Sequence, residues 1–151
     1  GGLRLVGTLQ SRDYTAVSKY YHAETVGRPD VYGGNADVLD DIKILRENYA
    51  GIARPALLHW YDTKILLDLK KTNSLEVFDF TAIFFKSEMD QLIQRVLEEK
   101  PQYLFVGRAG SGGGFAPFAV YTDKLEYFRA GVAGLYNVER ELKTMDVLVL
   151  R

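Results

Sequence analysis

The stretch Ala56-Leu-Leu-His-Trp-Tyr-Asp-Thr-Lys-Ile-Leu-Leu67 decides the fold class, because a strand leads directly into a helix. The apolar run at its start is typical of a strand that is buried on both faces. Asp62 or Thr63 can begin a helix that extends to about Lys71, with isoleucine and leucine side chains at helical spacing. A strand that passes at once into a helix is the repeating unit of α/β domains.

The same alternation continues along the rest of the chain. It predicts an α/β fold, a three-layer sandwich with a mainly parallel sheet, helices on both faces and a C-terminal antiparallel pair. Residues 1–36 have no regular period and are predicted to form an irregular, tyrosine-rich N-terminal segment, followed by one α/β domain over 37–151, a single domain overall. The predicted helices cover about 37–49, 62–71, 88–99 and 122–133, and the predicted strands cover about 56–60, 75–85, 103–106, 136–143 and 147–150.

Composition disfavours several functional classes. The chain has 151 residues, with 19 Lys and Arg against 20 Asp and Glu, so it lacks the basic excess that binds nucleic acid phosphates. It has no cysteine, which excludes disulfides, thiol catalysis and cysteine-bound metals. Two histidines are too few for an all-histidine zinc site. We therefore expect no nucleic acid partner, no metal and no cofactor.

A glycine-dense loop over 107–117 follows a predicted buried strand. Glycine lets a backbone approach a phosphate closely, so the loop is a candidate anion or ligand site. The dinucleotide fingerprint is broken, because Phe115 stands where its third glycine belongs. A flexible surface loop without a ligand is the alternative. The candidate ligand-binding residues are Arg108, Gly110, Ser111, Gly112 and Gly113.

His59 and Asp62 are weak candidates for catalysis, because they lie at or just beyond the end of a predicted strand, at the edge where α/β sheets bind ligands. A carboxylate near an imidazole would favour its charged form and could assist a general base. The only other histidine is His22, so the spacing builds no triad, no catalytic residue is assigned, and a structural histidine is the alternative. The adjacent carboxylates Asp40 and Asp41 are predicted to lie on a solvated helix face.

Three segments together carry a family resemblance: the stretch quoted above, Lys100-Pro-Gln-Tyr-Leu-Phe-Val106, and Tyr136-Asn-Val-Glu-Arg-Glu-Leu-Lys-Thr-Met-Asp-Val-Leu-Val-Leu-Arg151. From Pro55 to Arg151 the chain resembles the soluble domain that follows the transmembrane helices in polytopic glycosyltransferases of the C superfamily. The resemblance implies a place on the extracytoplasmic face of a membrane, with the membrane portion of the same polypeptide and a lipid-linked sugar or glycan as partners. Catalytic carboxylates of that superfamily lie in the membrane portion, so none is carried over to this chain.

The expected function is therefore that of a non-catalytic extracytoplasmic accessory domain of a bacterial polytopic membrane protein. The parent suggested by the resemblance is a glycosyltransferase that uses lipid-linked sugars, and the domain would recognise substrate or pack on the membrane part. The opening Gly1-Gly2 predicts a piece of something larger. The alternative is a free-standing α/β enzyme or nucleotide- or phosphate-binding domain that uses the loop Gly107–Gly114 and His59. It would need a pocket that also includes Asp62 and Arg108. A structural interaction module without a ligand is a third possibility.

Overall fold

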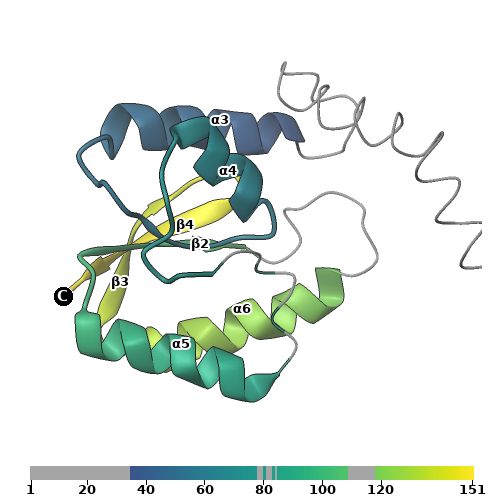
Figure 1. Ribbon diagram of the computed structural model, residues 1–151, viewed down its shortest axis with the longest axis vertical. Coiled ribbons are helices and arrows are strands. Elements are labelled where there is room, and N and C mark those ends of the chain that lie inside the picture. Colours follow the sequence, from purple (N-terminus) through teal and green to yellow (C-terminus); the bar gives the residue numbers. More distant parts are fainter. Residues whose placement is uncertain (1–34, 78–79, 81–82, 84, 109–117) are drawn as a thin grey trace, which may run out of the picture.

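The computed structural model describes residues 35–77, 80, 83, 85–108 and 118–151. Four strands form one mixed sheet in the order β1-β2-β4-β3. In Figure 1 helices α3 and α4 lie on one side of this sheet, and helices α5 and α6 lie on the other. The elements in chain order are α3 (Asn35–Asn48), β1 (Ala56–Leu58), α4 (Asp62–Leu69), α5 (Lys86–Glu99), β2 (Tyr103–Gly107), α6 (Phe118–Val132), β3 (Tyr136–Glu141) and β4 (Met145–Leu150).

The α/β class and the C-terminal antiparallel pair are confirmed, but the mainly parallel sheet is wrong. Only β1 and β2 are parallel. After α6 the chain forms the edge strand β3, and β4 then returns between β3 and β2, antiparallel to both. The alternation of strands and helices therefore stops at β3, and two of the three strand pairings in the sheet are antiparallel.

The two faces of the sheet bury separate apolar clusters. Neighbouring residues of a strand point to opposite faces. In β2, accordingly, Phe105 packs with the side chains of α3 and α4, whereas Leu104 and Val106 pack with those of α5 and α6. Both faces of the central strands are thus covered, which explains the apolar runs over 104–106 in β2 and 147–150 in β4.

The strand predicted over 75–85 is wrong for every described residue in that range, because none of them belongs to a strand. The side chain of Asn73 occupies the outer edge of β1, where it accepts a hydrogen bond from the Leu57 N–H (3.2 Å) and donates one to the Leu57 carbonyl (2.7 Å). Glu76 then takes a positive φ of 57°, which no regular strand contains. Leu75 and Phe80 are apolar because they fill the core beside α5 and α6.

Helix α6 begins at Phe118, four residues before the predicted start.

None of the helices in the described part of the chain is both long and apolar enough to cross a membrane.

Candidate functional site

Polar side chains gather where β1 and β2 end, at the edge that the sequence marks as a candidate site. His59 directly follows β1, and Gly107 is the last residue of β2. A Cβ atom on Gly107 would lie 3.3 Å from Cδ2 of His59 and 3.4 Å from the Leu58 carbonyl oxygen. The glycine therefore leaves the space into which the imidazole ring packs.

His59 is fully buried, and both of its ring nitrogens have protein partners. Nδ1 accepts a hydrogen bond from the Tyr61 N–H at 2.9 Å, and Nε2 lies 2.9 Å from Oγ1 of Thr144. Because Nδ1 is an acceptor, the neutral ring carries its proton on Nε2 and donates it to the threonine. Burial lowers the pKa of His59 to about 3. The ring is neutral and out of reach of solvent, so it cannot take a proton from a substrate.

Asp41 of α3 completes this buried network. Its carboxylate accepts hydrogen bonds from the Lys143 N–H (2.9 Å), the Thr144 N–H (2.6 Å) and the Thr144 hydroxyl (2.6 Å). The network ties α3 to the turn between β3 and β4, and through His59 to the end of β1. The solvated position predicted for Asp41 is wrong. A signal was present in the sequence, because Asp41 lies on the same helical stripe as Val38, Ile42 and Leu45.

Asp62 is also buried, and its contacts differ from those of His59. One carboxylate oxygen accepts from the Thr63 N–H at 2.7 Å, at the start of α4. The other accepts from the Phe80 N–H at 2.8 Å. Asp62 therefore fixes the segment after α4 against the start of that helix, which is a structural role.

Arg108 follows β2 and belongs to a cluster of charged side chains that also contains Asp146 of β4 and Arg129 of α6. Its guanidinium lies 3.1 Å from one oxygen of Asp146, while Arg129 of α6 lies 3.1 Å from the second oxygen. Arg129 also donates to the carbonyl oxygens of Val106 (3.0 Å) and Gly107 (3.1 Å). Asp146 already fills the space between the two guanidiniums with a carboxylate. The other candidate ligand residues, Gly110, Ser111, Gly112 and Gly113, lie outside the described residues.

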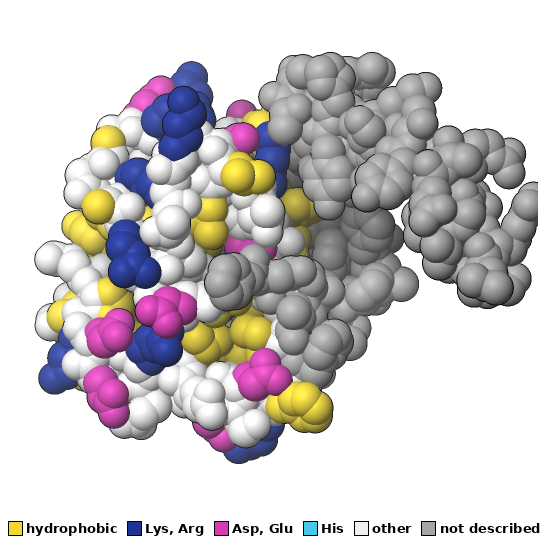
Figure 2. Space-filling model, in the orientation of Figure 1, with side chains coloured by type: hydrophobic (Ala, Val, Ile, Leu, Met, Phe, Trp, Pro, Cys, Tyr) yellow, Lys and Arg dark blue, Asp and Glu magenta, His cyan; other side chains and the backbone are white. Residues whose placement is uncertain are grey.

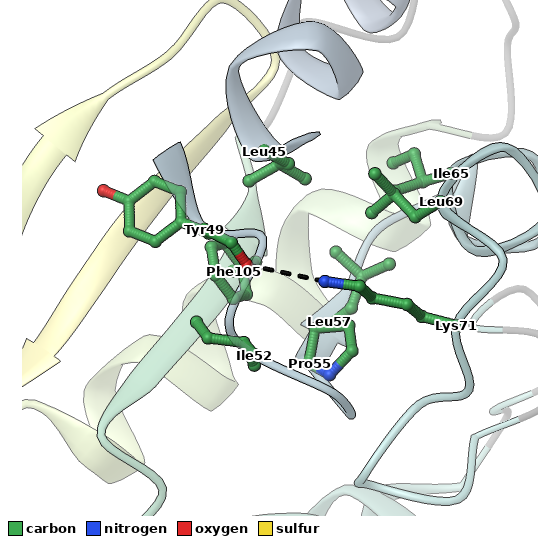
Figure 3. Close-up of a pocket in the computed structure, with 9 residues that line it drawn as sticks. All are labelled: Leu45, Tyr49, Ile52, Pro55, Leu57, Ile65, Leu69, Lys71 and Phe105. Atoms are coloured by element: carbon green, nitrogen blue, oxygen red, sulfur yellow. Dashed lines mark hydrogen bonds between the residues drawn. The ribbon is translucent and has the colours of Figure 1, made fainter. Parts of the chain in front are cut away.

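The pocket in Figure 3 lies between the helices α3 and α4 and the strands β1 and β2, and it is lined by none of the candidate site residues. It is apolar and has a volume of about 10 Å³, room for about one water molecule. Lys71 reaches across it and donates to the carbonyl oxygen of Ala50 at 3.2 Å, where α3 has ended. This contact satisfies a carbonyl near a helix C-terminus, as lysines commonly do.

Charge and metal chemistry add no site among the described residues. Figure 2 shows acidic and basic side chains interspersed over the visible face of the described surface. Within the described ranges, no group of three or more His, Asp or Glu side chains is placed to hold a metal ion. The polar groups at the strand ends bond mainly to one another and to backbone, so their arrangement supports a fold rather than a reaction. Comparisons of the chain with protein-family models, curated proteins and solved structures find no match.

Proposed function

We propose that this chain is a non-catalytic accessory domain of a polytopic membrane protein, held on its extracytoplasmic face. The observation that supports the non-catalytic part of this proposal is the state of His59. The sequence offers this residue as a weak candidate for a general base, yet the ring is buried, neutral and hydrogen-bonded at both nitrogens to the fold. A general base must reach the proton that it removes.

The class of the parent protein comes from the resemblance over 55–151. It suggests a bacterial glycosyltransferase that uses lipid-linked sugars, with catalysis in the membrane portion. The domain would then recognise substrate or pack over the membrane part. The partners in this proposal are the remainder of the polypeptide and a lipid-linked sugar or glycan.

The reading frame that encodes the chain tests the membrane part of the proposal. Several apolar runs of about 20 residues on the N-terminal side of the domain would support it. A frame without such runs would refute it, whatever the domain binds.

Activity of the parent protein tests the non-catalytic part. His59→Asn and Asp62→Asn should lower activity only as far as they lower the folded fraction, because both side chains hold the fold. A catalytic role predicts a folded variant whose turnover is lost. Folded fraction and turnover must therefore be measured on the same preparation.

The alternative function, a nucleotide- or phosphate-binding domain, is tested on the chain itself. It predicts that ATP or pyrophosphate binds and that Arg108→Gln weakens the binding. The carboxylate of Asp146 between the two arginines argues against it, because an incoming phosphate would have to displace that charge.

A further inference from the structure

We draw no further inference here: the strongest candidate, the open groove along α4 that Leu67 and Val77 line together with Glu76, mixes apolar and polar side chains, and nothing in the described part of the chain shows what covers it.

Discussion

Acid should destabilise this domain through His59, and the size of the effect follows from its burial. The pKa of the ring falls from 6.5 to about 3 on folding. Below pH 6.5 the imidazole of His59 is therefore protonated in the unfolded chain but stays neutral in the folded chain. The free energy of unfolding falls as the pH falls from 6.5 toward 3. Each pH unit in this window costs about 1.4 kcal/mol, which amounts to about 2 kcal/mol at pH 5. That is a large share of the about 5–15 kcal/mol by which a domain is stable.

Urea unfolding at about pH 7 and about pH 5 measures this loss. The single tryptophan, Trp60, reports it well, because it is buried beside the His59 ring at a centroid distance of 4.9 Å. His59→Asn keeps an acceptor near the Tyr61 N–H but cannot titrate, so its overall stability falls while its pH dependence shrinks by about 2 kcal/mol. The comparison rests on the difference between the two pH values, not on absolute stability.

His22→Asn is the matched control, because His22 is the only other histidine. The loss of stability that His59 causes should persist in this variant. Some carboxylates also make the domain less stable in acid. Hydrogen bonds from Tyr127 and Lys86 lower the pKa of Asp90, for example. Such carboxylates contribute equally to the parent chain and to both variants. If His59→Asn retains the full loss between the two pH values, the buried neutral state of the ring is refuted.

Three further substitutions test the contacts that hold the strand ends, each by urea unfolding at neutral pH. Asp41→Asn should cost about 2–3 kcal/mol, because its amide would face buried N–H donors, whereas Asp40→Asn on the exposed side of the same helix should change little. Asn73→Asp should cost about 2–3 kcal/mol, since it sets a carboxylate oxygen against the carbonyl on β1 to which the amide now donates; a stable variant would show that the edge of β1 does not need this amide. Gly107→Ala should cost about 1 kcal/mol by crowding the buried imidazole, while Gly51→Ala, with no atom within 4 Å of its added Cβ, should be neutral; equal effects would contradict the packing argument.

The sequence predicts elements where local chemistry and packing agree. The strand-to-helix step at 56–69 is an example, because an apolar run and then a helical period fall on adjacent segments. The described residues between 75 and 85 show the opposite case. Their apolar and β-branched side chains have strand propensity, but Asn73 closes the sheet edge that such a strand would need. Edge closure depends on a contact 16 residues apart, and no local pattern encodes it.

The candidate site shows a second limit. A histidine after a strand, with acidic and hydroxyl groups elsewhere in the chain, has the same sequence signature whether it is catalytic or structural. The side chain of His59 contacts Thr144, which lies 85 residues away in the turn before β4. Thr144 in turn contacts Asp41 of α3, which lies 103 residues away from it. These partners follow from the sheet order, which placed β4 next to β2, and the alternation of elements did not predict that order.

The order of groups in the network differs from that of a hydrolytic triad. In a triad the imidazole stands between the carboxylate and the hydroxyl, so it can withdraw the hydroxyl proton. Here the hydroxyl of Thr144 stands between Asp41 and His59: it donates a hydrogen bond to the carboxylate at 2.6 Å, and its oxygen accepts one from the imidazole Nε2–H at 2.9 Å. Its oxygen is buried and its proton already points to a negative charge, so no base is free to activate it. The same three kinds of group, a carboxylate, an imidazole and a hydroxyl, are buried here in a different order and stabilise a junction of helix, strand and turn.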